Sequence, residues 1–287
     1  MRLDRLAPDL LLLLDRSGSM ANDVNDMRCP VAQTCVTKWS ECTKAVNQVV
    51  QETEGSLRWG LKYFANDALC GVTAGVAVPV GAASTMAIAD SIAATMPGGN
   101  TPTRLAVASA GDYLMSLQDP NPKVLLLATD GEPNCPPGAN SSADDAPGAI
   151  AAVQALAAAG VPVYVIGIGN VATAQASLNQ LALAGGRPNA GATSYYPVAS
   201  SDDLVGAFRA IGAQAMPCTY ALGTVPAAPQ DLVVTAADVV IPRDAAHAEG
   251  WDYDASMSSI RLFGLWCAKD QANAFVDVEE TLPCPDR

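Results

Sequence analysis

The chain has 287 residues, 50% of them apolar, and its 29 acidic side chains outnumber the 16 basic ones to give a net charge of -13. Such an acidic protein is a poor candidate for binding nucleic acid or an anionic membrane, since both need basic side chains on the protein. The high apolar and low charged content exclude a disordered chain. The length predicts one large domain, or one domain with a small appendage.

Apolar runs and helical periodicities alternate over the first three quarters of the chain. Apolar runs typical of strands occur at 9–14, 57–64, 75–80, 124–129, 161–166 and 194–198. Helical spacing of apolar residues occurs at 36–50, 86–95, 103–118, 147–159, 178–183 and 202–213. This alternation predicts an α/β fold with a doubly wound, mostly parallel sheet and helices on both faces.

The alternation stops near Ala215. Beyond it, proline and alanine interrupt short β-like runs at 232–234, 239–242, 260–266 and 275–279. Three cysteines lie in this last part of the chain, and small cores often need disulfides to be stable. We therefore divide the chain into an α/β domain, residues 1–215, and a small disulfide-stapled β-rich extension, residues 216–287.

The eight cysteines favour disulfides over a metal site. None belongs to a C-x-x-C pair, only one histidine is present, and all but Cys42 fall in predicted loops or element ends. Disulfides imply an oxidising compartment, although the sequence does not determine the pairing. The apolar run at 10–14 is too short for a signal peptide, so an exported protein would have lost its signal or would start elsewhere.

Three polar clusters follow predicted strands or precede a predicted helix. The first strand ends in Asp15-Arg16-Ser17-Gly18-Ser19, a Gly-Gly-Asn-Thr-Pro-Thr loop spans 98–103, and a later strand ends in Thr129-Asp130-Gly131. In an open parallel sheet, ligands bind beyond the carboxyl ends of the strands. We expect the three clusters to meet at that edge.

The residue types in these clusters suit a hard metal ion. Asp15, Ser17 and Ser19 alternate, so an extended loop would point their oxygens the same way. A carboxylate with two hydroxyls suits Mg²⁺ or Mn²⁺. Each cluster also has an ordinary explanation as a turn or a helix cap. Their joint occurrence at one predicted sheet edge favours the metal site.

The same clusters resemble the metal-ion-dependent adhesion site (MIDAS) of von Willebrand factor type A (VWA) domains. That family carries D-x-S-x-S after its first strand, a threonine in a mid-chain loop and an aspartate after its fourth strand. The resemblance covers roughly residues 9–213 and implies a Rossmann-like VWA fold. The two serines would bind the metal directly, the two aspartates mostly through water, and the threonine directly in the open state. The implied metal-site residues are Asp15, Ser17, Ser19, Thr101 and Asp130.

The resemblance implies a divalent-cation-dependent protein-binding or adhesion module, not an enzyme. Its Mg²⁺ (or Mn²⁺) would complete its coordination with an Asp or Glu carboxylate of a protein or peptide ligand. We expect no nucleic-acid partner and no membrane-spanning segment. The chain also resembles secreted bacterial VWA proteins with a short disulfide-linked tail, which implies an extracytoplasmic location. The alternative is an intracellular VWA scaffold or a subunit of a larger metal-dependent complex, which free thiols would favour.

Two departures from the family pattern are visible. The link at 20–36, which holds Cys29 and Cys35, is longer than the family's usual connection and is expected at the rim of the site. Cys70 and Cys135 follow two strands that should end at the same edge of the sheet, so a bridge between them is a further expectation.

Other patterns carry less weight. Residues 167–172 match G-x-G-x-x-A, but no acidic residue follows at the distance a dinucleotide site requires. No P-loop is present, and His247 is the only possible base for a hydrolase. A hydrolase using the cation to activate water would need a further base near Ser17, and the sequence offers no clear one. The acidic pairs Asp23/Asp26 and Asp144/Asp145 are expected to be solvated loop charges near the metal edge, with a second cation site as the alternative. The pair Asp252/Asp254 is expected in a solvated turn, with Ca²⁺ binding as the alternative.

Overall fold

A computed structural model of the chain describes residues 4–30, 35–138, 142–215, 218–222, 225–226, 228–236, 239–256, 258–271 and 278–281. It contains two compact units. The larger unit spans Pro8–Asp119 and Lys123–Ile211, and the smaller one comprises the described parts of 1–7, 120–122 and 212–287.

The larger unit is built on a six-stranded sheet in the order β4-β3-β2-β5-β6-β7, in which only β4 runs antiparallel to its neighbour. The chain runs outward from β2 to β3 and β4, then returns to the other side of β2 as β5. The strand order therefore reverses between β2 and β5, where α/β sheets bind ligands. The strands are β2 (Asp9–Asp15), β3 (Arg58–Phe64), β4 (Val78–Gly81), β5 (Lys123–Thr129), β6 (Val163–Ile168) and β7 (Tyr196–Val198).

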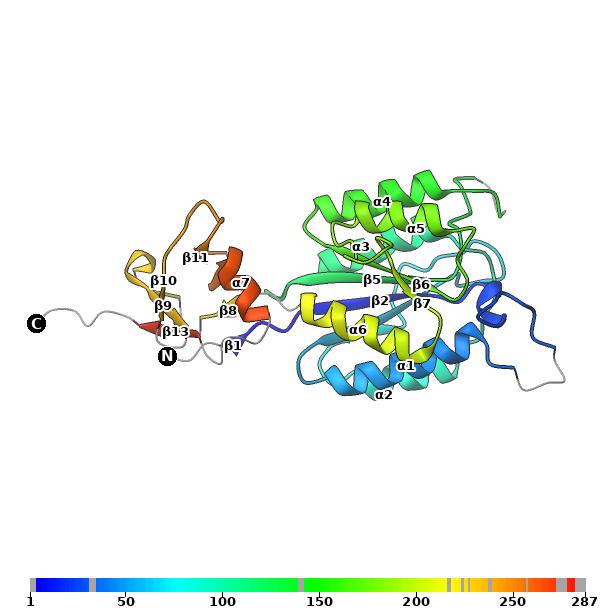
Figure 1. Cartoon of the computed structure of the whole chain (residues 1–287), viewed down its shortest axis with the longest axis horizontal. Helices are drawn as coiled ribbons and strands as arrows, with labels where there is room; N and C mark the ends of the chain where they lie inside the picture. The colour runs from blue at the N-terminus through cyan, green and yellow to red at the C-terminus, as the bar shows by residue number, and fades with distance from the viewer. Residues whose placement is uncertain are drawn as a thin grey trace, which may run out of the picture. The chain divides into compact units, whose positions relative to one another are not determined.

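Helices cover both faces of this sheet, as expected from the sequence: α1, α2 and α6 lie on one face and α3, α4 and α5 on the other (Figure 1). Every residue of β2 is buried, which explains why its sequence is an unbroken apolar run between two aspartates. The helices are α1 (Lys38–Thr53), α2 (Thr85–Ala93), α3 (Thr103–Ser116), α4 (Ala146–Ala158), α5 (Gln175–Ala184) and α6 (Ser201–Ala215).

Helix α1 begins two residues later than the sequence pattern predicts. Thr37 is its N-cap and forms a capping box with Ser40, which leaves Val36 outside the helix and 60% exposed. The buried face of α1 instead starts with Lys38 and continues through Cys42, Ala45 and Val46. A lysine therefore occupies a position on the core-facing stripe of this helix.

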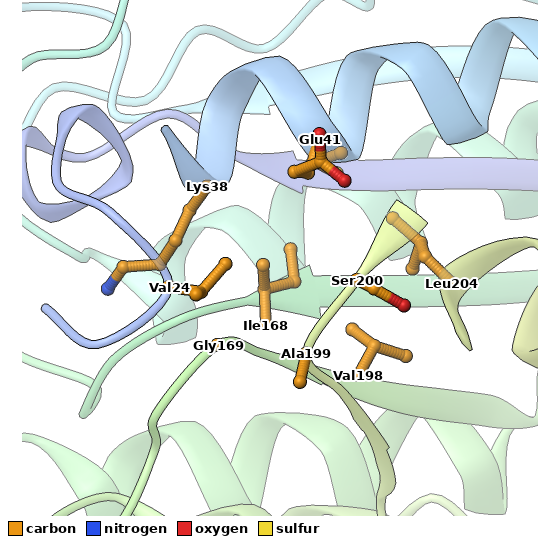
Figure 2. A pocket seen from close by; sticks show the side chains of 10 residues that line it. Val24, Lys38, Glu41, Ile168, Gly169, Val198, Ala199, Ser200 and Leu204 are labelled. Atoms are coloured by element: carbon orange, nitrogen blue, oxygen red, sulfur yellow. The ribbon is translucent and has the colours of Figure 1, made fainter. Parts of the chain in front are cut away.

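A small pocket lies between α1, the ends of β6 and β7, and the start of α6 (Figure 2). Glu41 of α1 accepts a hydrogen bond from the Ser201 backbone N–H at 2.9 Å. Ser200 caps the same helix end through the Asp203 N–H at 3.2 Å. The N-terminus of α6 is thus held partly by a side chain of α1.

The smaller unit contains two antiparallel sheets, in the orders β1-β8-β12-β11 and β10-β9-β13. Its core includes Trp251, Ile260 and Leu262, and a disulfide joins Cys218 to Cys267. The pairing of β1 with β8 places residues 4–7 in this unit. The elements are β1 (Asp4–Arg5), β8 (Thr219–Ala221), β9 (Val233–Ala236), β10 (Val239–Ile241), β11 (Gly250–Asp254), β12 (Ser259–Phe263), α7 (Gly264–Gln271) and β13 (Val278–Thr281).

Two sequence expectations for this part were wrong. The predicted strand at 260–266 ends at Phe263, because Gly264 adopts a positive φ of 61° and α7 begins there. The predicted turn at 250–254 is instead β11, whose Trp251 is only 2% exposed. The expected strand at 275–279 lies partly outside the described residues, as does Cys284. Within the described parts of the chain, no helix is both long and apolar enough to span a membrane.

Candidate metal centre

Asp15 forms the floor of the candidate site at the end of β2. Its side chain is fully buried, and its two oxygens have separate donors. The Ser17 backbone N–H donates to Oδ1 at 2.7 Å, and the Thr129 hydroxyl at the end of β5 donates to Oδ2 at 2.6 Å. The carboxylate is therefore held in one orientation by both strands that flank the reversal of strand order.

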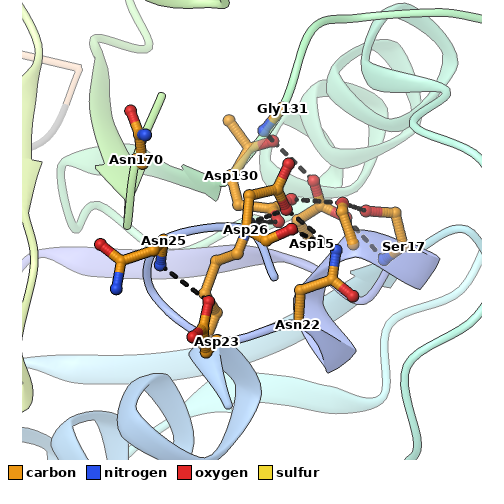
Figure 3. Close-up of polar contacts among 12 residues, drawn as sticks. Asp15, Ser17, Asn22, Asp23, Asn25, Asp26, Asp130, Gly131 and Asn170 are labelled. Carbon is orange, nitrogen blue, oxygen red and sulfur yellow. Dashed lines mark hydrogen bonds and ion pairs between the residues drawn. The ribbon is translucent and has the colours of Figure 1, made fainter. Parts of the chain in front are cut away.

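A chain of oxygens lies beside Asp15 (Figure 3). The Ser17 and Ser19 hydroxyls are 3.1 Å apart, and the Ser19 hydroxyl donates to Oδ1 of Asp130 at 2.9 Å. The short 3-10 helix Gly18–Ala21 turns the chain directly after β2 and holds Ser19 over the end of β5. Residues 111 positions apart in sequence thus share one hydrogen-bonded cluster.

The loop that carries Thr101 is joined to this cluster through backbone bonds. The Gly18 N–H donates to the Gly99 carbonyl at 3.0 Å, and the Gly98 N–H donates to the Arg16 carbonyl at 2.6 Å. Gly99 has a φ of 92°, and a Cβ on it would overlap the Asp67 carbonyl, so only glycine fits. Thr101 itself is buried, and the Asn134 side chain accepts from its backbone N–H at 2.7 Å.

One charged residue at the site, Lys38, was not identified from the sequence. The Lys38 ammonium lies 2.6 Å from Oδ2 of Asp130 and 2.9 Å from Oδ1 of Asp26, and the Lys38 side chain is 1% exposed. Asp26 was expected to be a solvated loop charge near this edge of the sheet; its side chain is 53% exposed, and it also binds the Lys38 ammonium. One signal was present: Lys38 falls four residues before Cys42 on the apolar stripe of α1.

The electrostatics of the site are dominated by burial. Burial raises the pKa of Asp15 to about 7, and the negative charge of Asp130 adds to that effect. For Lys38, burial works against the ammonium, but Asp130 and Asp26 outweigh it and raise the pKa of the lysine. Burial also raises the pKa of Asp130, against the lowering effect of the Lys38 ammonium and the Ser19 hydroxyl. The 2.6 Å contact nevertheless pairs the two side chains directly.

The donor set fits a hard divalent cation. The Ser17 and Ser19 hydroxyls and the Asp130 carboxylate form a hydrogen-bonded chain. The Asp15 carboxylate is tied to it through the Ser17 backbone N–H, and Thr101 is held on an adjoining loop. Among the described residues, no group of three or more His, Cys, Asp or Glu side chains is arranged to hold a metal. A cation here would therefore depend on the serine and threonine hydroxyls.

Disulfides border this edge of the sheet. Cys70 is bonded to Cys135, as expected, and Cys29 to Cys35. Cys42 is a buried free thiol. The acidic pair at 144–145 was wrongly expected to be solvated throughout, because Asp145 is buried and binds the Arg104 guanidinium at 2.7 Å.

The G-x-G-x-x-A segment has a structural role. Gly169 has a φ of 76°, and a Cβ on it would lie 2.9 Å from Cδ of Lys38 and 3.0 Å from the Val24 carbonyl. The Asn170 N–H donates to that same carbonyl at 2.8 Å. This glycine turn therefore accommodates the Lys38 stem and the backbone of Val24.

Residues 9–209 match the von Willebrand factor type A domain, which is more than half of the chain. The chain therefore belongs to the VWA family. No curated protein matches it in sequence.

Several solved structures share the fold. They include the PilB minor pilin from Streptococcus sanguinis (17% identity, TM-score 0.56, covering 74% of this chain and 61% of that chain). The pilus adhesin SpaC from Lactobacillus rhamnosus GG in its open conformation has 14% identity and a TM-score of 0.54, covering 92% of this chain and 38% of that one. The vWF domain of the type V pili tip protein Mfa5 from Porphyromonas gingivalis has 13% identity and a TM-score of 0.52, covering 74% and 95%.

Proposed function

We propose that the larger unit binds Mg²⁺ or Mn²⁺ and through it the carboxylate of a protein or peptide ligand. The residues that would hold the cation are Asp15, Ser17, Ser19, Thr101 and Asp130. The observation that carries the proposal is the contact of the Ser17 hydroxyl with that of Ser19, and of Ser19 with Asp130, directly above the buried carboxylate of Asp15.

The chemistry of these side chains explains why an external carboxylate would bind. Serine and threonine hydroxyls are neutral ligands, so a cation held mainly by them keeps most of its charge. Bound there, the cation would supply a Lewis-acidic position for an oxygen of an incoming Asp or Glu. The protein's own part is to fix the hydroxyls, through the Asp15 bond to Ser17 and the Gly18 bond to Gly99.

The similar structures support an adhesive role. Three of them are described as a minor pilin, a pilus adhesin and a pilus tip protein. The chain spans about 61% of the PilB structure and 38% of the SpaC structure, so their whole activities are not transferred. What we carry over is binding to a protein partner through the VWA unit.

Binding rather than catalysis is favoured by how the carboxylates are used. Asp15 accepts bonds from Ser17 and Thr129, and Asp130 accepts from Ser19 and is paired with Lys38. Neither is held ready to act as a general base. The single histidine of the sequence, His247, stacks on Phe263 in the smaller unit.

An extracytoplasmic location is part of the proposal. Three disulfides are present in the described residues, and disulfides persist mainly in oxidising compartments. They weigh against the intracellular alternative, a scaffold or subunit of a larger complex, which would hold free thiols.

The test is calorimetric titration of the full chain with Mg²⁺ and with Mn²⁺. We expect saturable binding by the wild type and none by the Asp15→Ala/Ser17→Ala variant. A matched control is Asp112→Ala/Ser116→Ala, which removes the same two residue types from exposed positions on α3.

Equal binding by all three proteins would place the cation elsewhere and contradict the proposal. A second titration, with glutamate-containing peptides in the presence of Mg²⁺ or of EDTA, tests the ligand class. Peptides that bind equally well in EDTA would show that the carboxylate is not recognised through a cation.

A further inference from the structure

The candidate site already contains a cationic group of the protein's own. The Lys38 ammonium bonds to Oδ2 of Asp130 at 2.6 Å, while the Ser19 hydroxyl bonds to Oδ1 of the same carboxylate at 2.9 Å. Both members of the ion pair are buried, at 1% and 0% side-chain exposure. Asp130 is thus shared between the hydroxyl cluster and a fixed positive charge.

Several features of the fold hold Lys38 in this place. The capping box at Thr37 starts α1 so that Lys38 faces the core. The Lys38 N–H donates to the Asn22 carbonyl at 2.8 Å, which ties the start of the helix to the loop that follows Ser19. Gly169 leaves room for the lysine stem, which lines the pocket in Figure 2, with its nitrogen pointing away from Glu41 and Ser200.

Asp26 gives the ammonium a second partner outside the hydroxyl cluster. Its Oδ1 lies 2.9 Å from Nζ of Lys38, and Asn22 donates to that oxygen at 3.0 Å. The Asp26 side chain is 53% exposed, unlike that of Asp130. If an incoming cation displaces the Lys38 ammonium from Asp130, the ammonium can therefore still pair with Asp26.

We propose that Lys38 is a built-in competing cation, which neutralises Asp130 in the metal-free protein and weakens the binding of a divalent cation at Ser17 and Ser19. This inference rests on the proposed metal site. A buried ammonium beside a metal ligand repels an incoming cation strongly, because the dielectric there is low. Lys38 also lets the metal-free protein keep Asp130 buried, since a lone buried carboxylate is costly.

Two consequences follow for ligand binding. The site would fill only when the divalent cation is abundant. Once the divalent cation is bound, the positive charge of Lys38 would add to that of the cation. The filled site would then carry more positive charge than the same site without the lysine. Such a site favours an anionic group on the partner, so Lys38 would set both the metal threshold and the preference for a carboxylate.

A purely structural lysine makes the opposite prediction for metal affinity. If Lys38 only supported the fold of the site, its removal would disorder the ligands and weaken cation binding. If Lys38 competes, its removal tightens cation binding. The direction of the change therefore separates the two roles.

The experiment is titration of the full chain with Mg²⁺ and Mn²⁺ in the wild type, Lys38→Met and Lys38→Gln. Glutamine keeps a neutral hydrogen-bond donor toward Asp130. The Lys38→Gln variant therefore still tests the proposal if Lys38→Met fails to fold. Lys44→Met removes the same charge from an exposed position on the same helix and is the control for long-range charge effects. We expect at least tenfold tighter binding in the two Lys38 variants and less than a twofold change in Lys44→Met.

Thermal unfolding supplies a second readout. In EDTA, Lys38→Met should unfold at a lower temperature than the wild type, and Mg²⁺ should raise its midpoint more than it raises that of the wild type. Adding Asp15→Ala/Ser17→Ala to Lys38→Met should abolish the tighter binding, which locates it at this site.

The outcomes distinguish the two proposals. If the wild type binds the cation and neither Lys38 variant binds it more tightly, Lys38 is not a competitor and the metal site stands. Tight binding by the variants alone, lost with Asp15 and Ser17, would support the competing lysine directly. If no protein in the series binds a divalent cation, both proposals are overturned.

Discussion

Among the described residues, the buried Asp15 carboxylate accepts from neutral donors, the Ser17 N–H and the Thr129 hydroxyl. Burial raises its pKa from an ordinary value of 3.8 to about 7. Between those two values the folded protein retains a proton that the unfolded chain has released. Stability contributed by this group is therefore present at low pH and is lost as the pH rises toward 7.

We expect this effect to disappear in Asp15→Asn. In EDTA, the free energy of unfolding of the wild type should fall between pH 5 and pH 8 by a few kcal/mol more than that of the variant. Mg²⁺ should reverse the loss at pH 8 in the wild type only, since the ionised carboxylate is then paired. Urea unfolding at both pH values measures this, and equal pH dependence in both proteins would contradict it.

At the scale of elements, the site is an assembly of loops that follow separate strands. The disulfide between Cys70 and Cys135 joins the loop after β3 to the loop after β5. Asn134, next to Cys135, accepts from the Thr101 N–H, and its own N–H donates to the Thr101 carbonyl at 2.9 Å. The bridge therefore fixes the loop that positions Thr101.

We expect Cys70→Ser/Cys135→Ser to lower the free energy of unfolding by about 4 kcal/mol, and Cys29→Ser/Cys35→Ser by about 2 kcal/mol. The difference arises because the first bridge spans 65 residues and the second only 6, and a longer closed loop restricts the unfolded chain more. The first variant should also bind Mg²⁺ more weakly. Equal losses of stability in both variants would show that loop length is not the cause.

At the scale of the whole molecule, the disulfides and the acidic net charge both support the proposed extracytoplasmic location. The net charge is -13, and bridges occur in both the larger and the smaller unit. Such a chain is suited to remaining in solution outside the reducing cytoplasm.

We expect protein isolated without reductant to give no free thiol at the six bridged cysteines. Cys42 should react with a thiol reagent only after unfolding, because it is fully buried. Peptide mass mapping of unreduced protein after thiol blocking measures this. Blocked thiols at Cys70 and Cys135 in freshly isolated protein would favour the intracellular alternative.

The sequence by itself determined the fold class and five candidate site residues. Apolar periodicity identified the strands and helices of the sheet, because that pattern depends on neighbours in the chain. The pattern D-x-S-x-S followed by a threonine and an aspartate named Asp15, Ser17, Ser19, Thr101 and Asp130. Ser17, Ser19 and Asp130 then meet in space because the carboxyl ends of parallel β2 and β5 share one edge.

Only the tertiary structure decided which charges meet those residues. The sequence analysis did not single out Lys38, and it expected Asp26 to be a solvated loop charge. In the fold, the Lys38 ammonium binds both Asp130 and Asp26, and the Lys38 N–H binds the Asn22 carbonyl of the preceding loop. Whether a charge is buried and paired depends on packing between segments far apart in sequence, which local patterns do not record. That packing places a protein cation beside the proposed metal ligands.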